Sequence, residues 1–219
     1  MYGLTKKQMS IIEKHAKSPE LALKRILKAG QKDSGNGLHL PESAFSDFAG
    51  KFVCRRYPAK KTLIRAGDLW DKVFFIHQGI IRLFYTDVLG REFNKGLFLE
   101  GQFLWPVAPS ARVEKSLFTI ATIEAVEASV CKFDPFYHWF HGHGIWEHFA
   151  LPHAEALAED KFAREYEFLM HTPQERYLAF CKKNPALAER LPAYHLASYL
   201  GITDVSLSRI KSRIKNASN

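Results

Sequence analysis

The chain has 219 residues, of which 47% are hydrophobic and 13% aromatic, and it carries a formal net charge of +8. This composition predicts a packed globular protein and excludes an intrinsically disordered one. No apolar run is long enough to span a membrane and the first ten residues lack the apolar core of a signal peptide, so we expect a soluble, cytoplasmic protein with no membrane partner.

The positive charge is concentrated at the two ends of the chain. Residues 1–40 contain eight Lys or Arg against three Asp or Glu, residues 41–171 contain fifteen against seventeen, and residues 172–219 contain eight against three. A basic terminal module indicates a polyanionic partner, because the neutralisation of phosphates releases counterions. For residues 1–40 alone, a solvated lysine-rich surface is the simpler explanation.

Short helices are predicted at the N-terminal end. Met9, Ile12 and Ala16 recur at helical spacing, and a second helix is predicted from Ser18 to Ala29. A glycine at the next position is expected to end this second helix, because glycine is a poor helix former and a good helix stop.

The centre of the chain is predicted to be a β-domain. A linker is expected at residues 31–37 (QKDSGNG) and an amphipathic helix from Ala44 to Cys54, before the pattern changes from Thr62 to Phe133. There, short runs of β-branched and aromatic residues alternate with glycine-bearing turns, which is typical of a small β-barrel or jelly roll. The runs include KVFFIHQ, IIRLFYT, SLFTIATIEA and SVCKFD.

A long helix is predicted from Trp146 to His171. Its apolar stripe is imperfect and is interrupted by Pro152. A long helix with one apolar side is a natural dimer contact, and packing against the chain's own β-domain would leave the same pattern. Periodicity alone does not choose between the two interpretations.

The last segment begins with the signals of a new helix. Thr172 and Glu175 have the spacing of a capping box, with a proline between them at the first helical position, and the helix is expected to end near Asn184. After a short connection, residues His195–Leu200 are predicted to form a helix that Gly201 ends with a tight turn.

A second helix of this module is predicted after Thr203, whose side chain can cap it. Leu207, Ile210 and Ile214 fall on one face, which we expect to be buried. Two helices joined by a tight turn, with an apolar face on the second, indicate a helix-turn-helix that binds double-stranded DNA, whereas an ordinary helical hairpin is the alternative. The predicted DNA-binding residues are Thr203, Asp204, Val205, Ser206, Ser208, Arg209, Ser212 and Arg213.

At these residues the chain resembles a known family. The run HLASYLGIT-x-x-SLSRI is similar to the helix-turn-helix of the Crp/Fnr (cyclic-AMP receptor/FNR) superfamily. The resemblance extends backwards through ERYLAFCKKNPAL and through AGDLWDKVFFIHQGIIRLFYTDVLGRE, which looks like the core of the cyclic-nucleotide-binding β-roll. It covers roughly Leu40 to Asn216, and residues 1–36 lie outside it.

The resemblance implies an α+β fold with a β-roll (jelly-roll) sensor domain, a long dimerisation helix and a winged helix-turn-helix. The domains expected on this basis are an N-terminal helical extension with linker at 1–37, the sensor domain at 38–143, the long helix at 144–171 and the DNA-binding domain at 172–219. It also implies a homodimeric transcription regulator on an inverted-repeat operator, with RNA polymerase as a further partner.

The base-reading positions of the family fall on Asp204, Val205 and Arg209. The best-known members have Arg and Glu at the first two places, so this sequence departs from both. Arg209 keeps the ability to bind guanine with two hydrogen bonds, and Val205 suits at most a thymine methyl group. We therefore expect an operator different from that of the cyclic-AMP receptor.

The ligand cassette of the family is altered. Leu104–Val107 replaces the carboxylate that accepts the ribose hydroxyls, and the phosphate arginine falls on Phe118, although Arg112 and Lys115 are near. A phosphate without a charged partner is poorly compensated, so we expect no binding of cyclic AMP. The residues of a possible ligand pocket are Gly101, Gln102, Phe103, Trp105, Arg112, Lys115, Ser116 and Phe118.

No cofactor is predicted. Three scattered cysteines do not suit a disulfide framework, a CxxC metal site or an iron–sulfur cluster. Histidines crowd into HWFHGHGIWEHFALPH, where His138, His141 and His143 are the candidate metal ligands. No cysteine or carboxylate completes a known metal spacing, so surface histidines around a flexible loop are the simpler interpretation.

No enzyme motif is recognised, and we do not expect an enzyme. The sequence has no GxSxG, HExxH, Walker or dinucleotide-binding motif. The competing function is a module that binds a cyclic nucleotide or another small molecule, or interacts with a partner, without specific DNA binding. The effector, the target genes and the direction of regulation cannot be read from the sequence.

Overall fold

The computed structural model describes residues 17–34 and 40–217, so the helix predicted around Met9–Ala16 lies outside the described residues. Two compact units divide the chain. The first unit contains the described residues up to Arg82 together with Leu97–Glu159, and the second contains Leu83–Gly96 and the described residues from Asp160 onwards. No described helix is long and apolar enough to cross a membrane.

The first described helix is longer than predicted. Helix α2 (Pro19–Ser34) continues through Gly30 and four residues into the expected linker. The prediction that Gly30 ends the helix is therefore wrong. A glycine inside a helix costs only about 1 kcal/mol relative to alanine, and α2 is held by four buried side chains, Ala22, Leu23, Ile26 and Leu27.

Helix α3 (Glu42–Gly50) is shorter than the predicted Ala44–Cys54 helix, because its last predicted residues enter a strand. Strand β1 (Val53–Tyr57) pairs antiparallel with β8 (Val126–Lys132), Cys54 lying opposite Ser129. The strand has an almost fully exposed sequence, VCRRY. The sequence analysis did not predict this strand, because it searched for apolar runs and VCRRY contains two arginines.

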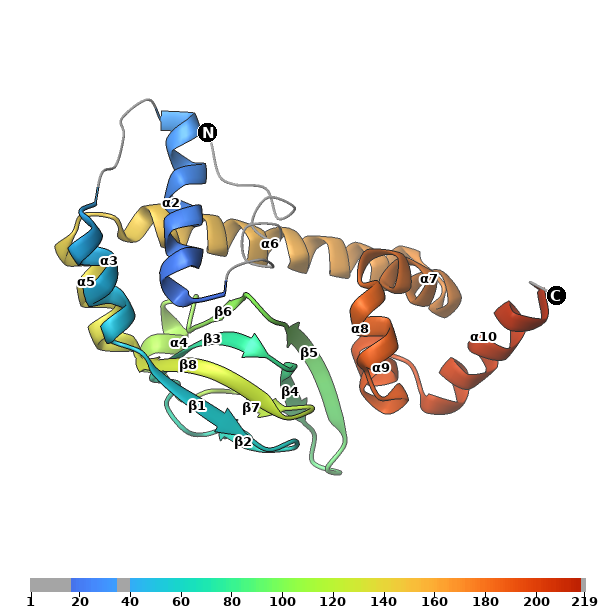
Figure 1. The fold of residues 1–219 in the computed structure, drawn as a ribbon. Helices are drawn as coiled ribbons and strands as arrows, with labels where there is room; N and C mark the ends of the chain where they lie inside the picture. Colours follow the sequence, from blue (N-terminus) through green and yellow to red (C-terminus); the bar gives the residue numbers. More distant parts are fainter. Residues whose placement is uncertain (1–16, 35–39, 218–219) are drawn as a thin grey trace. The chain divides into compact units, whose positions relative to one another are not determined.

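In the part of the chain that the structure describes, eight strands form two four-stranded sheets, whose strands are labelled in Figure 1. The strand order is β1-β8-β3-β6 in one sheet and β2-β7-β4-β5 in the other. The pairs of β1 with β8, β2 with β7, and β3 with β6 and β8 are antiparallel. The remaining bounds are β2 (Thr62–Ile64), β3 (Lys72–Gln78), β4 (Ile81–Thr86), β5 (Glu92–Phe98), β6 (Phe103–Leu104) and β7 (Thr119–Thr122). The predicted β-roll is confirmed.

Strand β3 shows why the sequence forms this sheet. Val73, Phe74, Phe75 and Ile76 are buried in succession, so both faces of the strand are covered. A continuous apolar run of this length is typical of a strand with a packed layer on each side. The run KVFFIHQ therefore matches β3 at both ends.

An aromatic core joins the helices of the first unit to its strands. Helix α5 (Phe133–Gly142) lies beside α3 in Figure 1, and the Phe48 ring contacts those of Phe136 and Phe140 at centroid distances of 5.8 and 5.5 Å. Side chains of α2 belong to the same buried cluster. A short helix, α4 (Ser110–Val113), precedes β7.

Helix α6 (Trp146–Met170) is the predicted long helix and is drawn as one continuous coil in Figure 1. Pro152 lies within it and is buried, without ending it. A proline removes one backbone hydrogen bond, and this position lies within the first two turns of the helix. The predicted long helix is therefore continuous through Pro152.

Four helices follow α6: α7 (Pro173–Lys183), α8 (Pro185–Arg190), α9 (Ala193–Leu200) and α10 (Asp204–Ala217). The capping box of Thr172 and Glu175 is present at the start of α7. Helix α8 occupies what was expected to be a plain connection. The described residues after Met170 contain no strand, so the wing of the expected winged helix-turn-helix has no counterpart among them.

Replacement of Phe149 by alanine tests the aromatic core. The side chain is fully buried, with its ring 4.6 Å from that of Phe140 and 5.4 Å from that of Phe103. Its loss leaves a cavity, and we expect the free energy of unfolding to fall by about 3–5 kcal/mol in urea denaturation. Val88→Ala, at a fully exposed position, should change it by less than about 0.5 kcal/mol. A loss below about 1 kcal/mol for Phe149→Ala would contradict this packing.

Candidate nucleic-acid interface

The turn between α9 and α10 is built on Gly201. This residue has φ +68° and ψ +37°, the left-handed region that favours glycine. The amide of Ile202 donates to the carbonyl of Ala197 at 3.1 Å, which closes the end of α9. A Cβ atom at Gly201 would lie 2.5 Å from Cε1 of Phe168, so this turn has no room for a side chain.

Thr203 begins α10 in the manner predicted. Its hydroxyl accepts a hydrogen bond from the amide of Ser206 at 3.1 Å and donates one to the Ser206 hydroxyl at 2.9 Å. The first helical turn thereby satisfies one of its free amides. This cap fixes where α10 starts and therefore which side chains face outwards.

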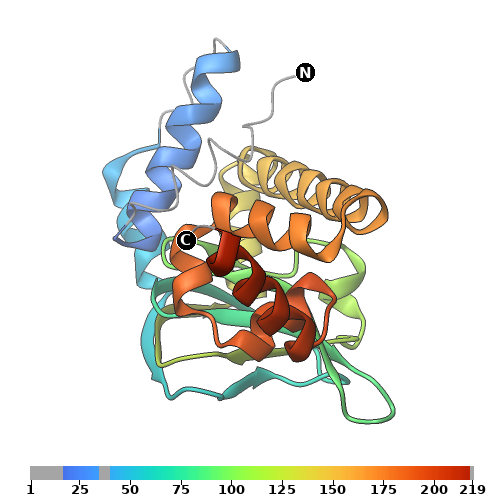
Figure 2. The same ribbon diagram turned by 90° about the vertical axis from the view of Figure 1, so that its right-hand side faces the viewer.

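Helix α10, drawn in dark red in Figure 2, has one buried side and one exposed polar side. Leu207 and Ile210 are buried and Ile214 is half-buried, as the apolar spacing predicted. Of the residues predicted to bind DNA, Ser206 is half-buried and the others are exposed: Thr203, Asp204, Val205, Ser208, Arg209, Ser212 and Arg213. Lys211 and Lys215, which the sequence analysis did not select, are also exposed.

Asn94 of strand β5 holds the first helix of the pair in place. Its amide nitrogen Nδ2 donates to the carbonyl of His195 at 2.9 Å, and its backbone amide donates to the hydroxyl of Ser198 at 2.9 Å. The same hydroxyl donates to the carbonyl of Glu92 at 2.8 Å. Because Asn94 is only 2% exposed, water competes weakly for these bonds. Helix α9 is therefore bound to the β4–β5 hairpin as well as to α10.

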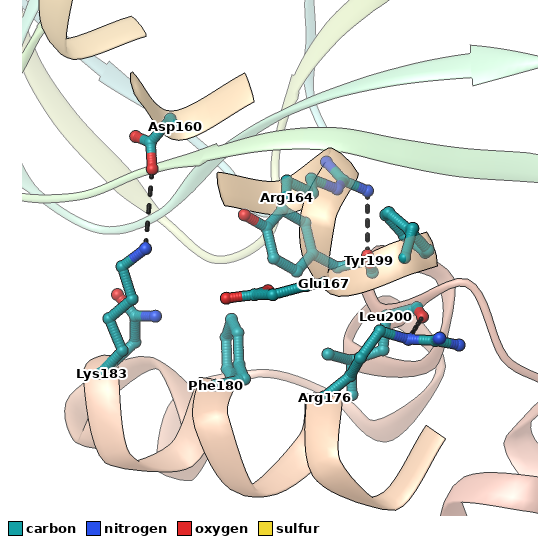
Figure 3. Close-up of a pocket in the computed structure, with 10 residues that line it drawn as sticks. Asp160, Arg164, Glu167, Arg176, Phe180, Lys183, Tyr199 and Leu200 are labelled. Atoms are coloured by element: carbon teal, nitrogen blue, oxygen red, sulfur yellow. Dashed lines mark hydrogen bonds and ion pairs between the residues drawn. The ribbon is translucent and has the colours of Figure 1, made fainter. Parts of the chain in front are cut away.

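Arg164 of α6 adds a second attachment. Its guanidinium donates to the carbonyls of Lys95 and Asn94 at 2.7 and 2.9 Å. It also donates to the carbonyl of Tyr199 at 2.9 Å and lies 4.3 Å from the centroid of the Tyr199 ring (Figure 3). Burial lowers its pKa, but an arginine remains charged at neutral pH. A single side chain thus connects α6, the hairpin and the end of α9.

Arg176 of α7 acts in the same way at the neighbouring helix ends. It donates to the carbonyl of His171, just after α6, at 2.9 Å and to that of Leu200, at the end of α9, at 3.2 Å (Figure 3). Arg164 and Arg176 line a small hollow with a volume of about 40 Å³. Lys183 and Asp160, which also line it, form an ion pair at 3.7 Å. Cations at helix C-termini are favourable because the free carbonyls are partly negative.

The residues of the predicted ligand pocket are divided between the core and its connecting turns. Phe103 and Trp105 are buried in the aromatic core. Gly101 and Gln102 form the turn before β6, in which the amide of Gly101 donates to the carbonyl of Ile76. Ser116 donates to the carbonyl of Phe118. Lys115 is exposed and pairs by its backbone with Leu69, while the Phe118 ring contacts Trp70.

Arg112, the candidate phosphate ligand, is held by other groups. Its guanidinium donates to the carbonyls of Pro106 and Val107 at 3.1 and 2.7 Å. It also lies 5.3–5.7 Å from the ring centroids of Trp105, Phe133 and Trp146. Burial lowers its pKa. Arg112 thus packs against the aromatic core, where cation–π contacts and two backbone carbonyls compensate its charge.

The candidate metal ligands are distributed along a helix and its end. His138 and His141 are part of α5 and His143 caps it, and all three side chains are exposed, as expected of surface histidines. Nδ1 of His138 is bonded to the carbonyl of Asp134, and Nδ1 of His143 to that of Trp139. Within the described residues, no three His, Cys, Asp or Glu side chains are grouped as metal ligands.

Comparisons with solved structures identify proteins that share this fold. CLP of Xanthomonas campestris, described as a c-di-GMP-responsive global regulator, is 14% identical with a TM-score of 0.65, covering 81% of this chain and 93% of that chain. FixK2 of Bradyrhizobium japonicum is 16% identical with a TM-score of 0.60, covering 76% and 86%. A CooA mutant of Carboxydothermus hydrogenoformans is 15% identical with a TM-score of 0.57, covering 77% and 78%.

The chain has the fold of the Crp/Fnr regulators. At these low identities the likeness concerns the fold. Comparison with protein-family models finds no match, and neither does comparison with curated proteins. Within the Crp/Fnr fold, the contacts of Asn94, Arg164 and Arg176 with α9 and its neighbours were not foreseen, because these residues are far apart in sequence and carry no motif.

Replacement of Gly201 by alanine tests the turn. Alanine is disfavoured in the left-handed region by about 1–2 kcal/mol, and contact with the Phe168 ring adds an overpacking cost of about 1–3 kcal/mol. We expect the free energy of unfolding, measured by urea denaturation with circular dichroism, to fall by about 2–5 kcal/mol.

Gly50→Ala is the matched control. A Cβ atom there meets nothing within 4 Å, so the free energy of unfolding should change by less than about 0.5 kcal/mol or rise slightly. Equal stability of the two variants would show that Gly201 is not needed for the turn.

Proposed function

We propose that the protein is a sequence-specific DNA-binding transcription regulator of the Crp/Fnr type. The observation that carries this proposal is helix α10: it is packed on Leu207 and Ile210, capped by Thr203, and free on the side that bears short polar and basic residues. A helix of this kind fits the major groove, which is wide enough to admit it. The fold, shared with known regulators, is consistent with this role.

The exposed side of α10 offers two kinds of contact. Arg209 is exposed near the start of the helix, where its fork suits the O6 and N7 atoms of guanine. Lys211, Arg213 and Lys215 are also exposed and suit phosphates, which give affinity without sequence preference. Asp204 and Val205 precede them, so we infer an operator that differs from that of the cyclic-AMP receptor.

The functional state is proposed to be a homodimer formed through α6. Phe162, Tyr166 and Leu169 are 67%, 58% and 76% exposed, and their spacing places them on one side of the helix. An exposed stripe of large apolar residues is stabilised when a partner covers it. A second copy of the same helix would cover it symmetrically. Two recognition helices would then read an inverted repeat about one helical turn apart.

The sensor domain is proposed not to respond to cyclic AMP. Phe103 and Trp105 fill the core, and the Arg112 guanidinium is bonded to carbonyls and lies 5.3–5.7 Å from the centroids of three aromatic rings. Its release to a phosphate would sacrifice those contacts. The contact with RNA polymerase implied by the resemblance stays a prediction. The competing function, a ligand-binding module without specific DNA binding, is distinguished by the DNA measurements below.

Replacement of Arg209 by alanine tests the recognition helix. We expect operator affinity, measured by fluorescence anisotropy on DNA selected from a random pool, to fall by about 1–3 kcal/mol, with relaxed preference at one base pair per half-site. Equal weakening on all sequences would make Arg209 a phosphate contact.

Arg65→Ala, at an exposed position in the first unit, is the matched control and should bind the operator as the unmodified chain does. For the unmodified chain, affinity should fall steeply with salt concentration. If the selection yields no preferred sequence and binding does not depend on salt, the regulator proposal fails and the ligand-binding alternative is preferred.

The double variant Phe162→Glu/Leu169→Glu tests the dimer. Charges within an apolar contact oppose its formation, so we expect monomers in sedimentation analysis and a loss of the preference for an inverted repeat over a single half-site. Val88→Glu, which places the same charge at an exposed apolar residue of the β4–β5 hairpin, should remain dimeric. A double variant that stays dimeric would assign the dimer contact to another surface.

A further inference from the structure

Three cations lie close together in a groove of the second unit. The groove runs between the β4–β5 hairpin and the last turns of α6 and has a volume of about 410 Å³. Its charged lining residues are Lys95 of the hairpin and Lys161, Arg164 and Glu165 of α6. With three cations against one carboxylate, this cationic groove carries an excess of positive charge.

The amino group of Lys161 faces two of these charges without a carboxylate partner. Among the described residues Lys161 forms no ion pair, although Glu165 follows it by one helical turn. Burial lowers the pKa of Lys161, and the charges of Lys95 and Arg164 lower it further. Desolvation and nearby like charges both disfavour the ammonium form. The neutral amine, which is the nucleophilic form of a lysine, is therefore favoured at this position.

Lys95 and Arg164 are more firmly held in the groove than Lys161. Burial and the charge of Arg164 lower the pKa of Lys95, but its ammonium lies 5.1 Å from the centroid of the Tyr85 ring, a contact that favours the charged form. Arg164 donates to three backbone carbonyls and, as an arginine, stays protonated. Both residues are half-buried, whereas the side chain of Lys161 is exposed. A small molecule from solvent therefore reaches the amine of Lys161 first.

We propose that Lys161 is a site of reversible modification by carbon dioxide, which its amino group takes up as a carbamate beside Lys95 and Arg164. The neutral amine attacks the carbon atom of carbon dioxide. A nitrogen–carbon bond forms, one carbon–oxygen π bond breaks with its electron pair left on oxygen, and the nitrogen releases a proton to water. Counted from the ammonium form, the side chain loses two protons and changes from a positive to a negative charge.

The charges of the groove favour this product over other modifications of a lysine. An acyl group on Lys161 would give a neutral amide and would only end the repulsion from the two cations. A carbamate replaces that repulsion by attraction. Lys95 and Arg164 would then face two anions, the carbamate and Glu165, so the charges of the groove would balance. A carbamate also has the planar shape of a carboxylate, the group that a guanidinium fork recognises well.

The modification acts on a contact that the second unit uses for its own stability. Arg164 joins α6 to the hairpin and to the end of α9 through backbone carbonyls, which compensate its charge only in part. A carbamate beside the guanidinium adds the missing negative charge. We therefore expect carbon dioxide to stabilise the protein against thermal unfolding, as any species that binds the folded state does.

Trapping of carbamates in the full-length protein tests the proposal. The protein is equilibrated with isotopically labelled carbon dioxide, its carbamates are converted to stable esters with triethyloxonium ion, and the labelled lysines are located by peptide mass spectrometry. We expect label on Lys161, in a fraction that rises from about pH 7 to about pH 9 at constant dissolved carbon dioxide, because the ammonium loses its proton. Lys182, an exposed lysine of α7 outside the groove, is the internal control and should carry at least about tenfold less label at neutral pH.

Two variants separate the amine from its surroundings. Lys161→Arg keeps the positive charge without a nucleophilic amine, so the rise in melting temperature under carbon dioxide should disappear. Lys95→Gln removes one of the cations that face Lys161 and should lower the labelled fraction of Lys161 at least about twofold. Thermal melts without carbon dioxide check that both variants are folded.

The possible results are distinct. Absence of label on Lys161, or equal label on Lys161 and Lys182, overturns the proposal. Label on Lys161 that Lys95→Gln leaves unchanged overturns the role assigned to the neighbouring cations. None of these results bears on the proposed DNA binding, which is carried by α10.

Discussion

The helical module at the C-terminal end depends on one half-buried cation that is paired with backbone carbonyls. Arg164 donates to the carbonyls of Asn94, Lys95 and Tyr199, and its pKa is lowered by burial. Carbonyl oxygens compensate a guanidinium less fully than a carboxylate does, so the arrangement requires a well-ordered set of acceptors. The hairpin, the end of α6 and α9 therefore stabilise one another through Arg164. Loss of any of the three would leave a charge in a partly dry site.

The hydrogen bonds of Asn94 complete this arrangement. Its side chain and backbone bind the carbonyl of His195 and the hydroxyl of Ser198, both on α9. In this structure α9 is thus supported from a strand as well as from its partner helix. The position of α10 follows from that of α9 through the turn at Gly201, where an added Cβ atom would lie 2.5 Å from Cε1 of Phe168.

Local signals in the sequence were sufficient for much of the fold. The capping box at Thr172, the stop at Gly201 and the buried face of Leu207 and Ile210 are short-range features, and the structure confirms them. Where tertiary packing decides, the sequence was insufficient: α2 continues through Gly30 because its buried side is held by the core, and β1 forms from VCRRY because β8 offers a free edge.

The site was predictable to the same extent. Exposure of the α10 residues follows from helical period, so most of the proposed DNA contacts were selected beforehand. The supporting residues were not, because Asn94 and Arg164 are separated by about seventy positions and no local pattern marks a side chain that binds distant carbonyls. The pocket expected around Arg112 was predicted only from the alignment of this sequence with the ligand cassette of the family. In the structure, Phe103 and Trp105 of that segment are packed into the core.

The last turns of helix α6 carry the exposed apolar stripe on one side and the Arg164 contacts on the other. At about 100° per residue, Arg164 points roughly 200° away from Phe162, so the two side chains lie on opposite sides of the helix. Phe168, four residues after Arg164, lies on the Arg164 side, whereas Leu169 returns to the side of Phe162. The angle between the exposed stripe and the attachment of α9 is therefore a matter of helical phase. An insertion of one residue between Phe162 and Arg164 would turn one side relative to the other by about 100°, whereas an insertion of seven would nearly restore the angle. The phase of α6 therefore sets the direction in which α9 and α10 project relative to any partner that covers the stripe.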